Sequence, residues 1–190
     1  MASDFEAVNK DFWYWIWMFR IHIFGWVIMA LAILSFASLL NEKPYSVLII
    51  PGAGVLVVGT FTLALAFAFY YSYGAWGIGQ TEDKSPEEVD EFMKGVTVVN
   101  HYMTCLIRFG RVFSGVGFAV LGIALFKWRI MDRWVAIFTV VMGVAAMAVV
   151  MLIPDNFEIY KPLFHVKVIW MALMGVLILT KGVNLTAQED

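Results

Sequence analysis

Residues 12–40 read FWYWIWMFRIHIFGWVIMALAILSFASLL, and Arg20 and His22 are the only basic side chains in this apolar run. A helix needs roughly 20 mostly apolar residues to cross the hydrocarbon core of a bilayer, and this run is longer than that. Its beginning is rich in Trp, Tyr and Phe, which is typical of the aromatic belt that transmembrane helices place at the headgroup level. The stretch therefore predicts a transmembrane helix.

Four further stretches have the same character. The whole chain is 62% apolar and only 15% charged, whereas soluble domains are about 45–50% apolar and about 25% charged. Lipid must therefore be the solvent for most of the chain, and we expect a multi-pass integral membrane protein in a lipid bilayer. The net charge of −2 gives no indication of a nucleic-acid partner. The predicted fold is all-α, a bundle of about five transmembrane helices in a single domain over residues 1–190, with helices at about 12–40, 47–73, 96–128, 134–153 and 162–181.

The longest polar connection is the acidic surface loop over residues 80–94, which reads QTEDKSPEEVDEFMK. Ser85 as N-cap, Pro86 in the first turn and Glu88 as the capping-box partner predict a short surface helix within it. The counts of Lys and Arg on the two membrane sides favour opposite orientations, depending on whether helix-end residues are included. The orientation therefore stays undetermined.

Small residues on the second and third predicted helices should let neighbouring helices approach closely. We interpret them as packing positions because apolar side chains surround them. They are Gly52, Gly54, Gly59, Gly110, Ser114, Gly115, Gly117 and Gly122.

Ionisable side chains inside membrane spans are costly, so they mark functional sites by default. All the histidines lie toward the membrane side that holds the N-terminus. At 1.5 Å per residue, His22 and His165 share a depth of roughly 6 Å in the hydrocarbon, with His101 nearer the surface. Arg20 lies about 200° around its helix from His22, so we expect it to reach lipid phosphates. The candidate cofactor-binding residues are His22, His101, Arg108, Arg111, His165 and Lys167.

Two histidines at one depth fit bis-histidine ligation of a haem b, with His22 and His165 as the metal ligands. Arg108 and Arg111 would then pair with the haem propionates. The same residues also fit a quinone or quinol site, in which His and Arg bond the ring oxygens and move protons. A copper site from the three histidines, including His101, is a third alternative. Alternatively, each histidine only satisfies a neighbouring polar group.

These chemistries predict a membrane redox protein or electron-transfer subunit with its site near one membrane surface. Whether it is itself an oxidoreductase stays open. Every Asp and Glu lies outside the predicted spans, which argues against a carboxylate-driven proton pump. A non-catalytic structural subunit of a larger membrane complex and a small-solute transporter are the alternative classes. The expected protein partners are other membrane subunits or further copies of this chain.

Three fragments resemble small membrane proteins of the HemJ-type protoporphyrinogen oxidase and copper-resistance CopD groups. They read FRIHIFGW at 19–26, RFGRVFSGVGFAVLGIAL at 108–125 and FHVKVIWMALMGVL at 164–177. The resemblance implies an association with haem, and it points to His22, to Arg108 or Arg111, and to His165 and Lys167. This chain departs from the pattern by a whole helix inserted between the His and Arg segments. The five-helix haem-b anchor subunits of respiratory enzymes are similar in architecture only.

Overall fold

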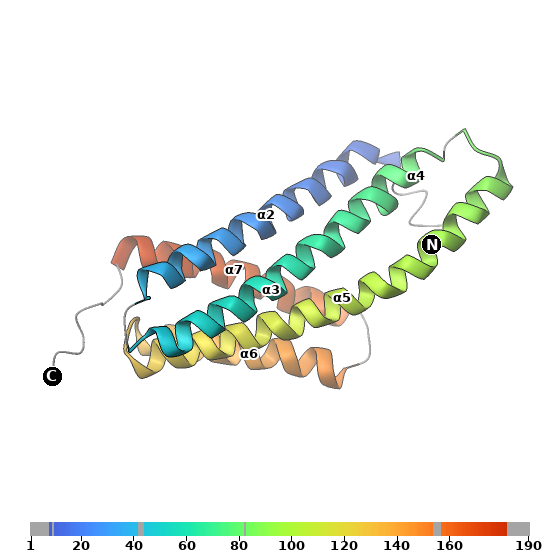
Figure 1. Ribbon diagram of the computed structural model, residues 1–190. Helices are drawn as coiled ribbons and strands as arrows, with labels where there is room; N and C mark the ends of the chain where they lie inside the picture. Colours follow the sequence, from blue (N-terminus) through green and yellow to red (C-terminus); the bar gives the residue numbers. More distant parts are fainter. Residues whose placement is uncertain (1–7, 9, 42–43, 82, 154–156, 182–190) are drawn as a thin grey trace. The chain divides into compact units, whose positions relative to one another are not determined.

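The computed structural model describes residues 8, 10–41, 44–81, 83–153 and 157–181. Every regular element in these ranges is helical, as Figure 1 shows. The elements are α2 (Phe12–Leu39), α3 (Ser46–Phe69), the π-helical segment η1 (Tyr70–Trp76), α4 (Gly77–Gly79), α5 (Pro86–Lys127), α6 (Arg133–Leu152) and α7 (Phe157–Lys181).

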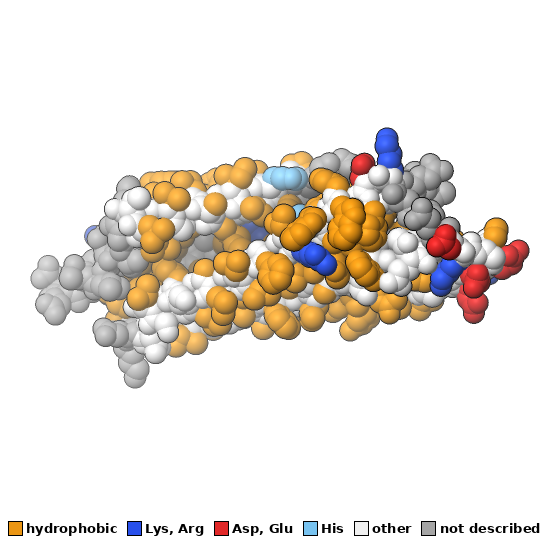
Figure 2. All heavy atoms as spheres, turned by 90° about the horizontal axis from the view of Figure 1, so that it is seen from above, with side chains coloured by type: hydrophobic (Ala, Val, Ile, Leu, Met, Phe, Trp, Pro, Cys, Tyr) orange, Lys and Arg blue, Asp and Glu red, His pale blue; other side chains and the backbone are white. Residues whose placement is uncertain are grey.

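Within these ranges, five helical spans are long and apolar enough to cross a membrane. Large apolar side chains face outward along them: Leu152 is 80% exposed and Leu179 is 86% exposed. Figure 2 shows hydrophobic side chains over most of the face in view. Apolar surface on this scale is stable when lipid is the solvent. The chain is therefore a multi-pass integral membrane protein, and the predicted all-α class with five transmembrane helices is confirmed.

The second span is longer than predicted. We expected it at 47–73, and the structure has an unbroken helical segment over Ser46–Gly79, visible as one continuous ribbon in Figure 1. No proline interrupts the chain between Pro51 and Gly79, so the helix has no reason to end at residue 73. The extension includes the π-helical segment η1, a type of turn that is rare and often found at functional sites.

Residues 86–94 of the acidic stretch form the start of α5, the helix that carries the third span, and do not form a separate helix. α5 is a single helix of 42 residues. Its start has the predicted capping box: the Ser85 N–H donates to Glu88 Oε2 at 2.9 Å, and the Glu88 N–H donates to Ser85 Oγ at 3.3 Å. A helix of this length extends about 63 Å, against about 30 Å for the hydrocarbon core. Its first turns therefore stand outside the membrane, and Figure 2 shows the Asp and Glu side chains gathered at that end.

The last helix begins earlier than predicted. The fifth span, Pro162–Thr180, agrees with the predicted 162–181 to within one residue, but α7 itself starts at Phe157, so Pro162 lies inside the helix and not in its first turn. Proline lacks an N–H, so one backbone hydrogen bond is missing there while the helix continues through it. Residues 154–156, which connect α6 to α7, lie outside the described residues. The predicted bounds of α2 and α6 agree with the structure to within one residue at each end.

The chain packs in two compact units. The first comprises Met1–Ala30 and Thr60–Gly110, and the second comprises Leu31–Gly59 and Arg111–Asp190. Both are discontinuous in sequence, because α2, α3 and α5 each contribute residues to both. The single domain expected from the sequence stays a prediction, and each unit is described by itself.

In the first unit, the start of α2 pairs with the end of α3 and with the helical residues that follow it. The His22 and Phe67 ring centres are 4.9 Å apart, and those of Phe12 and Trp76 are 6.0 Å apart. The residue with the lower number on α2 contacts the residue with the higher number on the second span, so the two helices run antiparallel. The buried centre of this cluster is formed by Val8, Ile16, Ala75 and Ile78.

In the second unit, glycines let α3, α5 and α6 approach closely. A Cβ atom on Gly117 would lie 2.6 Å from the Cβ atom of Leu56 on α3. A Cβ atom on Gly143 would lie 2.5 Å from the backbone nitrogen of Ala119 on α5. Neither separation leaves room for a side chain, so the predicted packing role of Gly117 is confirmed. Gly54 is different, because a Cβ atom there would have nothing within 4 Å.

The last helix packs on α6 through Trp170. Its indole Nε1–H donates to the buried Thr139 Oγ1 at 3.2 Å, and its ring centre lies 4.4 Å from that of Phe138. The Thr139 hydroxyl in turn donates to the Val135 carbonyl at 2.7 Å. This polar connection sits inside an apolar core, so it aligns α6 and α7 more specifically than apolar packing alone.

Candidate functional site

The six predicted site residues divide between the two units. Each can therefore be placed only among the residues of its own unit. Because His22 belongs to the first unit and His165 to the second, their shared role as haem ligands stays a prediction. The first unit holds His22, His101 and Arg108, and the second holds Arg111, His165 and Lys167.

His22 is held in place by two contacts. Its Nδ1 lies 2.7 Å from the Met18 carbonyl oxygen, one turn earlier on α2. A carbonyl can only accept, so Nδ1 carries the hydrogen and donates, and in the neutral imidazole Nε2 then carries the lone pair. The ring also stacks on Phe67, with 4.9 Å between ring centres and 12° between ring planes. This is the arrangement by which proteins fix a histidine whose Nε2 binds a metal or accepts a hydrogen bond.

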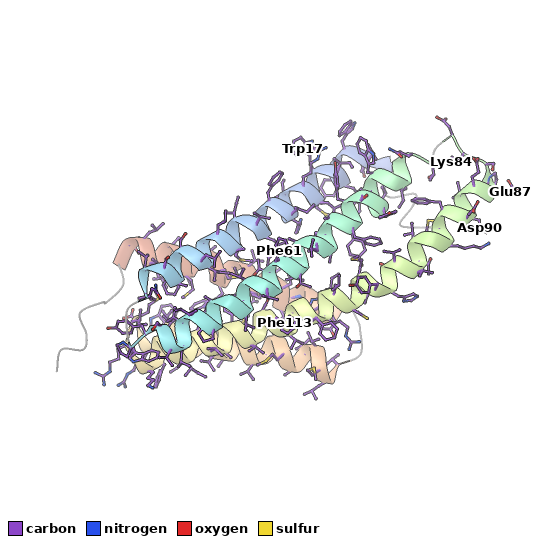
Figure 3. All side chains as sticks on the ribbon, in the orientation of Figure 1. Trp17, Phe61, Lys84, Glu87, Asp90 and Phe113 are labelled. Carbon is purple, nitrogen blue, oxygen red and sulfur yellow. The ribbon has the colours of Figure 1, made fainter. Side chains whose placement is uncertain are left out.

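A groove on the surface of α2 lies beside this imidazole. It is an open groove with a volume of about 470 Å³, and we call it the α2 groove. Its walls are mostly aromatic and aliphatic, with Trp17 projecting outward from the helix (Figure 3). The lining residues come from the aromatic belt and the turn after it: Trp13, Tyr14, Trp17, Met18, Ile21 and His22. The groove therefore combines flat apolar surface with a half-buried histidine that also stacks on Phe67 of α3.

Arg20 has partners within the protein, and the expectation that it reaches lipid phosphates stays a prediction. Its Nη2 and Nε donate to the Tyr71 hydroxyl oxygen at 2.9 and 3.3 Å. The guanidinium carbon also lies 5.2 Å from the centre of the Trp17 ring, a cation–π distance. Tyr71 was missed as a partner because a tyrosine near a span end is typical of the headgroup belt. Arg20 therefore steadies one wall of the α2 groove from within the protein.

The π-helical segment η1 directs two neighbouring tyrosines to different helices. The Tyr71 hydroxyl meets Arg20 on α2, while the Tyr70 hydroxyl donates to Asn100 Oδ1 on α5 at 3.0 Å. Adjacent helical residues point about 100° apart, so one segment can bond helices on two sides. The two hydroxyls therefore connect α2 and α5 to η1 within the first unit.

On α5, polar side chains recur at helical spacing and are only partly buried: Asn100, His101, Thr104, Cys105 and Arg108. His101 and Cys105 are exposed, and the Thr104 hydroxyl donates to the Asn100 carbonyl of its own helix at 2.9 Å. Arg108 is half-buried. We interpret the exposed members as facing the membrane interface, consistent with the position nearer the surface that the sequence gives His101.

In the second unit, the two cations expected at the site contact the α5–α7 interface. The Arg111 guanidinium carbon lies 4.4 Å from the centre of the Tyr160 ring. Lys167 is buried, and its Nζ lies 5.9 Å from the centre of the Phe118 ring. His165 is exposed and lies two residues from Lys167, on another face of α7. Lys167 is therefore an interior group and Arg111 is half-buried, whereas the exposed His165 points in a different direction from Lys167.

Among the described residues, no three His, Cys, Asp or Glu side chains gather closely enough to hold a metal ion. The copper site from three histidines accordingly gains no support. Comparison of the chain with protein-family models, curated proteins and solved structures gives no match. The resemblance to the HemJ-type and CopD groups therefore stays a prediction, and the function has to be argued from the site itself.

Proposed function

We propose that this chain is a membrane redox subunit that binds a quinol in the α2 groove, with His22 as the hydrogen-bond acceptor for a quinol hydroxyl. The observation that carries the proposal is a groove of about 470 Å³ in which a positioned histidine lies among aromatic side chains. A quinol combines the same features: a flat ring, a polar hydroxyl at its edge and an isoprenoid tail that dissolves in lipid.

The walls of the groove favour a flat apolar ligand. Trp13 and Trp17 are 63% and 56% exposed, so their ring faces are available for stacking. Aromatic pairs in offset or edge-to-face contact contribute about 0.5–1.5 kcal/mol beyond the burial of their area. The Arg20–Tyr71 hydrogen bonds and the Arg20–Trp17 contact support this wall, which reduces the ordering cost of binding.

The tautomer of His22 favours the reduced ligand. Because Nδ1 donates to the Met18 carbonyl, a neutral imidazole presents Nε2 as an acceptor. A quinol hydroxyl donates to such an acceptor, whereas a quinone carbonyl needs a donor. When a partner subunit oxidises the bound quinol to the quinone, its redox centre takes both electrons, one hydroxyl proton passes to Nε2, and the proton of the second hydroxyl passes to water at the membrane surface. His22 thus acts as a general base at the membrane interface.

Titration of the purified protein in nanodiscs with a decyl-tailed benzoquinol, kept anaerobic and followed by calorimetry, tests the proposal. We expect His22→Ala to weaken binding about tenfold, the loss of one well-placed hydrogen bond. His22→Gln, which retains an acceptor oxygen, should lose less. His165→Ala is the matched control, because His165 is not among the residues that line the groove, and the affinity of this variant for the quinol should equal that of the parent protein.

Equal affinity of the His22→Ala variant and the parent protein would overturn the proposal. The ultraviolet–visible spectrum, recorded with and without dithionite, separates the haem alternative from it. A Soret band that both His22→Ala and His165→Ala abolish would assign these residues to haem b instead. A Soret band that survives both changes would remove them as haem ligands.

A further inference from the structure

Two contacts between α5 and α7 set the alignment of these helices in the second unit. Arg111 on α5 meets the Tyr160 ring on α7, and seven residues further along each helix Phe118 meets Lys167. The two contacts lie seven residues apart on each helix and follow the same order along both, so the two helices run parallel. It also means that each contact recurs on the same helix face, two turns on.

Ser114 lies between these two contacts. It follows Arg111 by three residues and precedes Phe118 by four, so all three share one face of α5. Its side chain is fully buried, and its hydroxyl has no hydrogen-bond partner among the described residues. A buried hydroxyl without a partner is unfavourable, and native proteins rarely keep one without a reason such as a ligand. Packing alone, the role that the sequence suggested for Ser114, does not explain a hydroxyl here.

The same region carries two positive charges. Lys167 is only 6% exposed, and both cations lie against aromatic rings of the same α5–α7 interface, Arg111 against Tyr160 and Lys167 against Phe118. Helical side chains lean toward the helix N-terminus, so on two parallel helices the Lys167 side chain leans toward the end of the interface that holds Arg111, with its Nζ 5.9 Å from the centre of the Phe118 ring. Two cations and a hydroxyl donor together match the chemistry of an oxyanion, for which Arg supplies a fork of donors and Lys a point charge.

We propose that Arg111, Ser114 and Lys167 form a binding site for a phosphate group between α5 and α7. Basic sites between transmembrane helices bind the headgroups of anionic phospholipids, and free inorganic phosphate offers the same oxygens. The bound phosphate accepts hydrogen bonds from the Ser114 hydroxyl and from both cations. The three residues belong to the second unit and do not line the α2 groove, so the phosphate site can be tested independently of quinol binding.

Native mass spectrometry of the full chain, with phosphatidylglycerol, phosphatidylcholine or inorganic phosphate added in turn, tests this site. We expect phosphatidylglycerol to bind at least about tenfold more tightly than phosphatidylcholine, as charge-assisted hydrogen bonds imply. Lys167→Met should remove this preference. Lys127→Met is the matched control, because Lys127 is an exposed lysine in the last turn of α5, and it should keep the preference.

Ser114→Ala keeps the test decisive if Lys167→Met fails to fold. This change removes a hydroxyl that has no described partner, so the protein without ligand should be as stable as the parent or more stable, while its phosphatidylglycerol affinity falls about fivefold. Selective binding of phosphatidylglycerol identifies a lipid headgroup as the ligand. Binding of inorganic phosphate with the same dependence on Ser114 and Lys167 identifies a free anion. A lipid preference that is unchanged in both variants overturns the proposal.

Discussion

Replacing Gly143 with alanine should separate α5 from α6. The new Cβ atom would lie 2.5 Å from the Ala119 nitrogen and 2.6 Å from the Gly115 carbonyl oxygen. Both neighbours are backbone atoms, so they cannot rotate away as a side chain would. The contacts are roughly 1 Å shorter than an optimal van der Waals separation, and the two helices must move apart to relieve them.

The magnitude follows from two opposing terms. Alanine is a better helix former than glycine by about 1 kcal/mol, and overpacking of a filled interior costs about 1–3 kcal/mol. With rigid backbone on both sides we take the upper value, which gives a net loss of about 2 kcal/mol for Gly143→Ala. Gly54→Ala is the matched control, because nothing lies within 4 Å of its new methyl group. It should gain up to about 1 kcal/mol from helix propensity alone.

Equilibrium unfolding in dodecyl maltoside with increasing dodecyl sulfate, followed by far-ultraviolet circular dichroism, measures both free energies. The two variants should differ by about 3 kcal/mol, in opposite directions from the parent protein. Equal stabilities of the two variants would refute the reasoning, since the same substitution would then have the same effect with and without a facing backbone.

Two polar contacts give further predictions. Tyr71→Phe removes the oxygen that accepts both Arg20 hydrogen bonds, so the free energy of unfolding should fall by about 1 kcal/mol. Tyr14→Phe is the control, because the Tyr14 side chain is 65% exposed, and it should leave the free energy of unfolding unchanged. If Tyr71→Phe leaves the free energy of unfolding unchanged, the Arg20–Tyr71 hydrogen bonds do not stabilise the protein, and lipid phosphates become the expected partners of Arg20. Thr139→Val removes the acceptor of the Trp170 indole and should cost about 1 kcal/mol in the same unfolding assay. Thr139→Ser, which retains that acceptor, should cost less, and equal losses would contradict the role of the hydrogen bond.

At the candidate site, the sequence predicted where residues lie along their own helix but not which residues of other helices they contact. The depth of His22 and its position on α2 follow from counting residues, but the Met18 and Phe67 contacts that fix its ring do not. The position of Arg20 around α2 was predicted, and its partner was not, because Tyr71 lies 51 residues away on a π-helical segment. Helical spacing describes one helix at a time, so it cannot say which neighbour a given face meets.

The sequence by itself determined the five membrane spans and the capping box at the start of α5. Each depends on local features, namely the length of an apolar run and the spacing of Ser85 and Glu88. Only the tertiary structure decided that Lys167 lies inside the second unit while His165, two residues away, is exposed. It likewise decided that Ser114 is fully buried and that its hydroxyl has no hydrogen-bond partner among the described residues. The physical reason is that burial depends on which helix packs against which face, and that packing is set jointly by residues far apart in the chain.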